Sequence, residues 1–150
     1  ENYDPRPESS YSLSKVMGEE MARQYCRRNP EMKIFGLRYS NIMEKHDYKQ
    51  FQSFQKDPFL RKWNFWGYID ARDVAQACLL AMEIKLKGAD NFIIAADDTV
   101  MNEDNKKLLD TVFPNINIKG EIGKNKTLLN NEKAKKILGF KPEYSWRKIN

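Results

Sequence analysis

The feature of this sequence that most limits its fold is a helix-length periodic segment followed directly by a short apolar strand. Apolar residues recur at three- and four-residue spacing from about residue 9 to residue 28, which predicts an amphipathic helix with Ser9 or Ser10 as its N-cap. An Asn-Pro pair ends that pattern, and residues 32–38 are apolar and bounded by turn signals, as a buried strand is. A helix that leads into a buried strand predicts a parallel α/β sheet.

The same order of elements continues to the end of the chain. Residues 40–62 are polar and aromatic without clean periodicity, which predicts a long functional loop with a short helix near residues 51–55. The later segments alternate between strand and helix patterns. Strands are predicted at residues 65–69, 91–95 and 116–118. Helices are predicted at residues 74–84, from Asn102 or Glu103 to Pro114, and from Asn130 to Gly139. No internal repeat or Gly/Ser-rich linker interrupts them, so residues 1–150 are expected to form a single unit.

Composition bears on the class of protein and on its partners. With 41% hydrophobic residues, a chain of 150 residues can bury a core, although its mean hydropathy is −0.76. No apolar run reaches the length of about 18 residues that spans a membrane, and the first residues lack the pattern of a signal peptide, so we expect no membrane association and a cytoplasmic location. The net charge of +5 suits an anionic partner, but the basic residues are scattered among 21 acidic ones, so no nucleic-acid partner is expected.

The strongest clue to chemistry is the four-residue spacing of Tyr11 and Lys15, which places a phenol and an ammonium on one face of the predicted helix. A phenol has a reference pKa of about 10, and a nearby cation favours its phenolate, which brings proton transfer near neutral pH within reach. Tyr144 and Lys148 share this spacing, but they follow Pro142 and no helical pattern comes after them. The sequence context therefore has to decide between the two pairs.

Four segments, taken in their order along the chain, favour the first pair. They are Tyr11-x-x-x-Lys15, then Leu37-Arg38-Tyr39-Ser40-Asn41, then Tyr68-Ile69-Asp70-Ala71-Arg72-Asp73-Val74-Ala75, then Lys133-Ala134-x-x-x-Leu138-Gly139-Phe140-x-Pro142. In this order they resemble the extended short-chain dehydrogenases/reductases, the NAD-dependent epimerase/dehydratase family, from the family's catalytic helix to its C-terminus. The resemblance covers nearly all of the chain.

The resemblance implies an α/β fold made of the C-terminal part of a Rossmann-like parallel sheet and a small α/β substrate-binding region. It implies NAD or NADP as the cofactor, a sugar or nucleotide sugar as the substrate, Tyr11 as general acid/base, and Lys15 as the residue that lowers its pKa and binds the nicotinamide ribose. Tyr39 and Ser40 are then expected beside the cofactor and Asn41 beside the substrate, because ligands gather at the carboxyl ends of parallel strands. A homodimer through the catalytic helix is expected by the same resemblance.

The glycine-rich turn with which the family holds a pyrophosphate is absent. No Gly-x-x-Gly-x-x-Gly occurs, and only ten residues precede Tyr11. We therefore expect the chain to be the C-terminal portion of a longer enzyme, without its N-terminal dinucleotide-binding half. We expect neither tight NAD(P) binding nor turnover from this portion alone, and a low-micromolar affinity in calorimetry would contradict this.

One departure from the family pattern bears on the substrate. Where many nucleotide-sugar epimerases have Arg-Asp before the Tyr-Ile segment, with the Arg on a substrate phosphate, this chain has Trp66-Gly67. Loss of that bidentate contact leaves Arg38, Arg61 or Arg72 to supply a charge, and we expect Trp66 and Arg72 to contact the substrate. A free sugar or sugar acid is the alternative substrate, since uronate dehydrogenases of the family also lack the clamp.

Structural roles compete with these functional ones. The aromatic residues at 63–66 can stack on a sugar, but an aromatic cluster beside a strand is more often core. Asp70 and Asp73 are expected to cap the helix that follows them, and the single His46 has no partner at metal-binding spacing, so no metal site is expected. A non-catalytic protein that senses a dinucleotide or binds a partner, and a basic module that binds nucleic acid, are the alternative functions.

Overall fold

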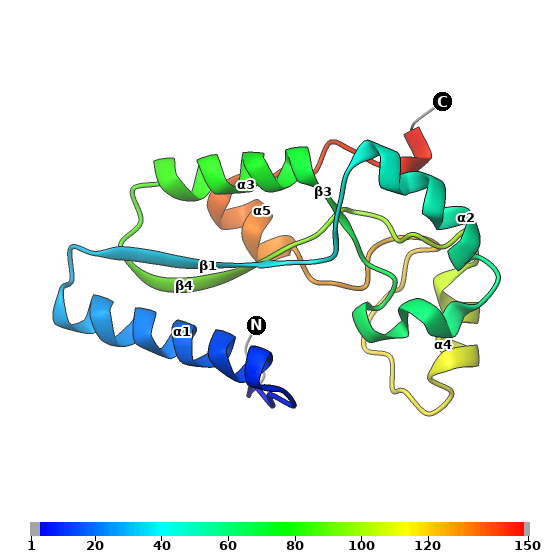
Figure 1. The fold of residues 1–150 in the computed structure, drawn as a ribbon, viewed down its shortest axis with the longest axis horizontal. Helices are drawn as coiled ribbons and strands as arrows, with labels where there is room; N and C mark the ends of the chain where they lie inside the picture. Colours follow the sequence, from blue (N-terminus) through cyan, green and yellow to red (C-terminus); the bar gives the residue numbers. More distant parts are fainter. Residues whose placement is uncertain (1–3, 149–150) are drawn as a thin grey trace.

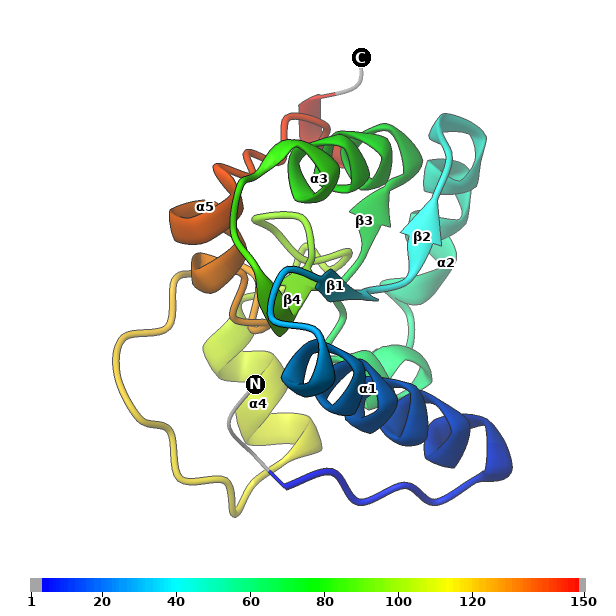
Figure 2. The same ribbon diagram turned by 90° about the vertical axis from the view of Figure 1, so that its left-hand side faces the viewer.

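The computed structural model describes residues 4–148. At its centre two strands, β1 (Lys33–Tyr39) and β4 (Gly88–Ile94), run parallel, with Lys33 opposite Gly88 and Tyr39 opposite Ile94. α1 (Ser10–Arg28) covers one face of this pair and α3 (Ala71–Glu83) covers the other (Figure 1, Figure 2). α5 (Glu132–Leu138) lies beside α3 and packs against β4. The parallel α/β arrangement predicted from the sequence is confirmed.

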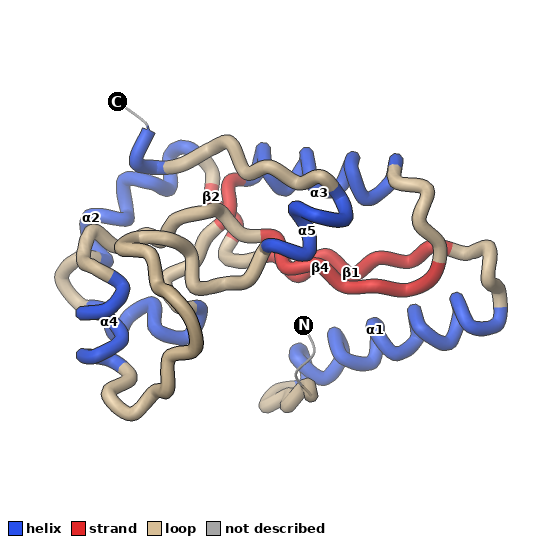
Figure 3. Tube along the Cα trace, turned by 180° about the vertical axis from the view of Figure 1, so that it is seen from behind, coloured by secondary structure: helices blue, strands red, loops and turns tan. Residues whose placement is uncertain are grey.

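A second, smaller region continues from the C-terminal ends of β1 and β4 (Figure 1, Figure 3). In it β2 (Ile42–Met43) pairs in parallel with β3 (Ile69–Asp70). The remaining elements of this region are short helices, namely η1 (Lys45–Gln50), α2 (Phe51–Phe54), η2 (Pro58–Asn64), α4 (Asn105–Val112) and η3 (Trp146–Lys148). The short helix expected near residues 51–55 is confirmed, but 3-10 turns order much of the remaining segment that was predicted to be a loop.

α1 begins where the sequence predicts. The Ser9 hydroxyl accepts a hydrogen bond from the backbone N–H of Ser12, and the Ser12 hydroxyl accepts one from the backbone N–H of Ser9. This reciprocal cap satisfies two N–H groups that a helix terminus otherwise leaves unpaired. α1 then runs back along β1, so its first turn lies beside the C-terminal end of that strand (Figure 1). Its apolar stripe is exposed in the described chain and consists of Leu13, Met17, Met21 and Tyr25.

The strand predicted over residues 65–69 is wrong for most of its length. Phe65 and Trp66 have φ angles of 50° and 57°, so the chain turns through the left-handed region and ends η2 there. This turn places the Trp66 indole in the core, and its burial outweighs the local preference of aromatic residues for strands. Residues 116–118 also form no strand, because Ile116 and Ile118 lie on an exposed segment that no strand of residues 4–148 pairs with.

The two carboxylates at the start of α3 have different roles. Asp70 is the N-cap, as predicted, and accepts a hydrogen bond from the backbone N–H of Arg72. The capping role predicted for Asp73 is wrong. Asp73 is fully buried and accepts hydrogen bonds of 3.0 and 3.1 Å from the backbone N–H groups of Glu143 and Tyr144. It therefore anchors the C-terminal segment against α3.

Candidate active site

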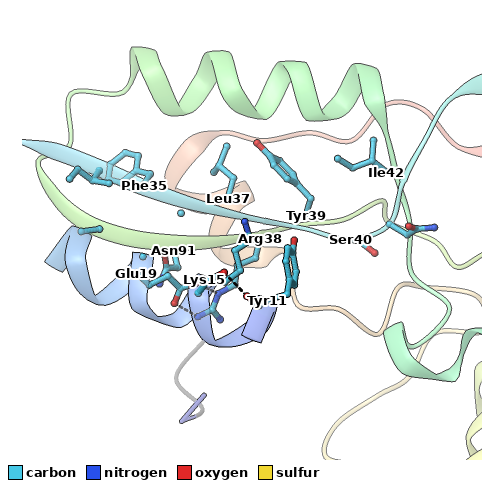
Figure 4. Close-up of a pocket in the computed structure, with 16 residues that line it drawn as sticks. Tyr11, Lys15, Glu19, Phe35, Leu37, Arg38, Tyr39, Ser40, Ile42 and Asn91 are labelled. Carbon is cyan, nitrogen blue, oxygen red and sulfur yellow. Dashed lines mark hydrogen bonds and ion pairs between the residues drawn. The ribbon is translucent and has the colours of Figure 1, made fainter. Parts of the chain in front are cut away.

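An open groove runs between α1 and β1 (Figure 4). Its volume is about 870 Å³. It follows the edge of β1 that pairs with no other strand in residues 4–148. The groove is lined by the two candidate catalytic residues, by the two polar residues that follow β1 and by the two residues of an ion pair. In that order, these six residues are Tyr11, Lys15, Ser40, Asn41, Glu19 and Arg38. Residues predicted from separate sequence motifs thus meet in one place.

Tyr11 and Lys15 meet as their spacing predicts. The Lys15 Nζ lies 4.9 Å from the centroid of the Tyr11 ring, above its face. Tyr11 is 72% exposed, so its phenol is open to the groove and to solvent. The capping serines start the helix immediately before Tyr11, which fixes the pair on the first turns of α1. The arrangement leaves the hydroxyl reachable by a ligand while an ammonium lies against the ring.

The next turn of α1 carries an ion pair that the sequence reasoning missed. Glu19 accepts two hydrogen bonds from Arg38 of β1, at 2.7 Å from Nε and 2.6 Å from Nη2. The hydrogen bond from Arg38 lowers the pKa of the Glu19 carboxyl, although burial opposes the shift. The signal was present in the sequence, because Glu19 stands four residues after Lys15 and therefore on the same helix face. The pair fastens α1 to β1 inside the groove.

This pair predicts a specific pH dependence. Because the folded-state pKa of Glu19 lies below its ordinary value near 4.5, its contribution is present above that value and is lost as pH falls through the folded pKa. Between about pH 6 and about pH 3, we expect the free energy of unfolding to fall by about 1 kcal/mol more in the unsubstituted protein than in Glu19→Gln. The difference is small because the Arg38 side chain is partly exposed to solvent. Urea unfolding of both proteins at the two pH values measures this. Identical pH dependence would contradict it.

A glycine on β1 leaves space for the Asn91 side chain of β4. Gly36 stands opposite Asn91 in the sheet register, and a Cβ built on Gly36 would lie 2.2 Å from the Asn91 Oδ1. Asn91 lines the groove and also hydrogen-bonds Glu19, which helps to lower the pKa of that carboxyl. The sequence reasoning missed Asn91, since this contact depends on the pairing register of two strands 55 residues apart.

Ser40 and Asn41 lie where the sequence predicts, directly after β1 and beside the first turn of α1. The Ser40 N–H donates to the Ile94 carbonyl, and the Asn41 carbonyl accepts from the Ile69 N–H, both at 3.0 Å. These bonds hold the segment that connects the two parallel strand pairs. The Ser40 Oγ is buried without a hydrogen-bond partner among residues 4–148. The roles of Ser40 and Asn41 toward ligands stay predictions.

Tyr39 does not join Tyr11 in the groove through its phenol. Successive side chains of a strand point to opposite faces, so Tyr39 points toward α3 while Arg38 points toward α1 (Figure 4). The Tyr39 hydroxyl lies 3.1 Å from the Cys78 Sγ of α3. Burial, together with this hydrogen bond, raises the pKa of Tyr39 to about 12. A ligand in the groove can therefore contact the backbone of Tyr39 but not its hydroxyl.

The two other predicted substrate contacts lie away from the groove. Trp66 is fully buried and its indole N–H donates to the Pro58 carbonyl at 2.8 Å, so its predicted contact with a substrate is wrong. Arg72 forms a bidentate ion pair with Asp70, at 2.8 and 2.9 Å. Its guanidinium also stacks 3.6 Å from the centroid of the Tyr144 ring. These contacts hold Arg72 against Asp70 and Tyr144, and it does not line the groove.

Residues 4–148 contain neither a metal-ligand cluster nor a membrane-spanning helix. No three His, Cys, Asp or Glu side chains of this range come together as metal ligands. None of the helices in it is both long enough and apolar enough to cross a membrane.

Comparison with known families decides what kind of protein this is. The family described as "NAD dependent epimerase/dehydratase family" matches residues 1–95, which include Tyr11, Lys15 and all of β1. The chain belongs to this family. The family resemblance is thereby confirmed over residues 1–95, which hold the first three of the four ordered segments. No curated protein matches the chain in sequence.

A solved structure supports the same fold for this epimerase/dehydratase chain. A chain described as "MoeE5 in complex with UDP-glucuronic acid and NAD" matches it with a TM-score of 0.59 and 17% sequence identity. The match covers 99% of the epimerase/dehydratase chain and 55% of the MoeE5 chain, so the chain spans about half the length of that protein. At this identity the likeness concerns the fold, which is part of a Rossmann-like α/β architecture, as predicted.

Proposed function

We propose that this chain is the catalytic and substrate-binding portion of an NAD(P)-dependent oxidoreductase or epimerase/dehydratase that acts on a sugar or nucleotide sugar. One observation carries the proposal. The Lys15 ammonium lies against the Tyr11 ring in an open groove beside the carboxyl end of a parallel strand. That end of a parallel sheet is where ligands of open α/β folds bind.

Tyr11 is the group that moves a proton. Its hydroxyl gives a proton to a substrate carbonyl oxygen as the carbonyl becomes an alcohol, and in the reverse direction its phenolate takes the proton of the alcohol as the carbonyl forms. The Lys15 ammonium lies against the Tyr11 ring, where its positive charge offsets the negative charge that develops on the phenol oxygen during the transfer. When bound, the nicotinamide cofactor accepts or supplies the hydride at the carbon that carries this oxygen.

The residues present fit the nicotinamide end of the cofactor and not its pyrophosphate end. Lys15 and Ser40 offer an ammonium and a hydroxyl beside Tyr11, which suits the hydroxyls of a ribose. The glycine-rich turn for a pyrophosphate is absent from the sequence. We propose that the rest of a longer protein supplies it, because the chain spans 55% of the length of MoeE5 and the outer edge of β1 offers its backbone groups to another strand.

A substrate without a nucleotide is the second candidate, and the fate of Trp66 and Arg72 favours it. Trp66 replaces the family's phosphate-clamping Arg and is buried, while Asp70 neutralises Arg72. The site therefore lacks the usual clamp on a pyrophosphate, which suits a free sugar or sugar acid.

We also propose a homodimer, in which a second copy of the chain covers the exposed apolar stripe of α1. Sedimentation of the full-length protein tests this, because the measured mass is that of either one chain or two.

An activity assay on the full-length protein tests the proposal. The protein is incubated with NAD or NADP and with UDP-glucuronate, UDP-glucose, glucuronate or glucose, each in turn. We expect reduced nicotinamide for an oxidoreductase, or an epimerised or dehydrated sugar detected by NMR. Product from a free sugar acid alone selects the second candidate. Absence of any product across such a panel of sugars, in a protein that binds NAD, favours a non-catalytic sensor and contradicts the proposal.

A further inference from the structure

Three arginines were candidates for the charge that Trp66 fails to supply, and the structure separates them. Arg38 forms a bidentate ion pair with Glu19, and Arg72 forms one with Asp70. Each of these guanidinium groups therefore has a carboxylate against it. Arg61 differs from both.

Arg61 is a buried cation without a counter-charge. It is 8% exposed, and no carboxylate of residues 4–148 lies within ion-pair distance of it. Its Nη2 donates to the Gly67 carbonyl at 3.4 Å, and its Nε is buried without a hydrogen-bond partner among the same residues. The rings of Phe54 and Trp63 lie 4.8 and 5.4 Å from the guanidinium carbon. Burial lowers the pKa of Arg61, but a guanidinium stays protonated at neutral pH, so a positive charge is held in a poorly solvated place.

Asn41 connects this charge to the groove. With the Asn41 carboxamide oriented so that its oxygen faces Arg61, which is the orientation that its surroundings favour, that oxygen accepts two hydrogen bonds from Arg61, at 3.2 and 3.0 Å. Since the oxygen and the NH2 group stand on opposite sides of a planar amide, the two N–H donors of Asn41 point away from Arg61, and Asn41 lines the groove. The neighbouring residue, Ser40, has its hydroxyl packed against Gly67, at 3.0 Å from the position that a Cβ would take on that glycine. The N–H donors of Asn41 and the Ser40 hydroxyl thus lie at one end of the groove, with the positive charge of Arg61 behind Asn41.

We propose that Arg61 makes this end of the groove select a substrate that carries an anionic group, a carboxylate or a phosphate. Arg61 acts as a positioning residue. It holds the Asn41 oxygen, so that the Asn41 N–H donors face the anion, and its uncompensated charge strengthens those hydrogen bonds because burial of Arg61 limits screening of that charge by water. The proposal rests on the proposed function only in taking the groove as the substrate site.

The test compares three small ligands that differ in one group, namely glucose, glucuronate and glucose 1-phosphate. NMR titration of the full-length protein is expected to give at least one anionic ligand a dissociation constant about tenfold below that of glucose. The anion with the larger gain shows whether a carboxylate or a phosphate is recognised. Equal affinity for the three ligands would overturn the proposal.

Two charge-removing substitutions locate the preference. Arg61→Met is expected to bring the three dissociation constants to within about twofold of one another, because the charge behind Asn41 is lost. Arg27→Met removes a charge from the exposed far end of α1 and is the control that keeps the preference. An anion preference that survives in Arg61→Met counts against the proposal.

Asn41→Asp separates the site from simple damage to the fold. The new carboxylate would face Arg61 and form the buried ion pair that the chain lacks, so the melting temperature without ligand is expected to rise while the anion preference disappears. A lower melting temperature would mean that the Arg61 charge is already compensated. Either that result or a persistent anion preference in Asn41→Asp would refute the assignment.

Failure of this inference can be distinguished from failure of the proposed function. The ligand titrations need neither NAD nor the Tyr11 hydroxyl, so Tyr11→Phe should keep the anion preference whatever happens to turnover. Loss of turnover in Tyr11→Phe with equal binding of all three ligands keeps the enzyme and removes the role of Arg61. Unchanged turnover with a clear anion preference does the opposite.

Discussion

Replacing Tyr11 by Phe in the full-length protein is expected to reduce turnover by about 10²–10⁴-fold, which is the range for loss of a general acid/base. The ring and its contact with Lys15 remain, so the local packing is kept and only the hydroxyl that we propose to move the proton is lost. Affinity for NAD should change by less than about twofold, because the proposed contact of Lys15 with the ribose does not involve the Tyr11 hydroxyl. Steady-state kinetics and calorimetric titration of NAD measure the two effects.

α1 supplies a matched control for this substitution. Tyr25 stands on the same helix, is 46% exposed and has the Arg28 guanidinium 5.3 Å from its ring centroid, so it repeats the chemistry of the Tyr11 and Lys15 pair outside the groove. Tyr25→Phe should leave turnover unchanged. If Tyr11→Phe behaved like Tyr25→Phe, the pair at the head of α1 would be an ordinary surface contact.

Trp66→Ala is expected to cost about 3–5 kcal/mol of the free energy of unfolding, as deletion of a large buried side chain does. Trp66 is fully buried among the core residues of the smaller region, and its indole packs against the Phe113 ring at a centroid distance of 6.2 Å. The substitution leaves a cavity and removes the donor to the Pro58 carbonyl. The melting temperature should fall by roughly 10 °C for a chain of this size.

Trp63 is the control, because it stands three residues earlier and is 67% exposed. Trp63→Ala should cost less than about 1 kcal/mol, mainly through its contact with the Arg61 guanidinium. A stability loss in Trp66→Ala no larger than in Trp63→Ala would contradict the buried position of Trp66. It would also reopen the original prediction that this indole contacts a substrate.

The parts of the site that follow from local rules were predictable from the sequence. Tyr11 and Lys15 share a helix face because four residues make about one turn, and the capping serines and the following Asn-Pro pair bound that helix. Ser40 and Asn41 come to the same groove because they follow a parallel strand at its carboxyl end. Each of these inferences uses residues that are close in sequence.

The parts that depend on distant contacts were not predictable. Asn91 reaches the groove only because Gly36 stands opposite it across the sheet. Aromatic residues at 65–69 favour a strand locally, yet the core of the smaller region draws Trp66 inward and the backbone turns instead. Arg72 was expected at a substrate, but Asp70 and a ring from the C-terminal segment hold it elsewhere. The missing information in each case was which distant segment lies alongside.

The unpaired edge of β1 has a practical consequence for handling the isolated chain. The edge of a half-buried strand that pairs with no other strand in residues 4–148 is a template to which another polypeptide can add a strand, including a misfolded copy of the same chain. When it is expressed by itself, the chain should therefore be prone to aggregation and precipitation. Co-expression with a complementary polypeptide that lays a strand along this edge should bring it into the soluble fraction.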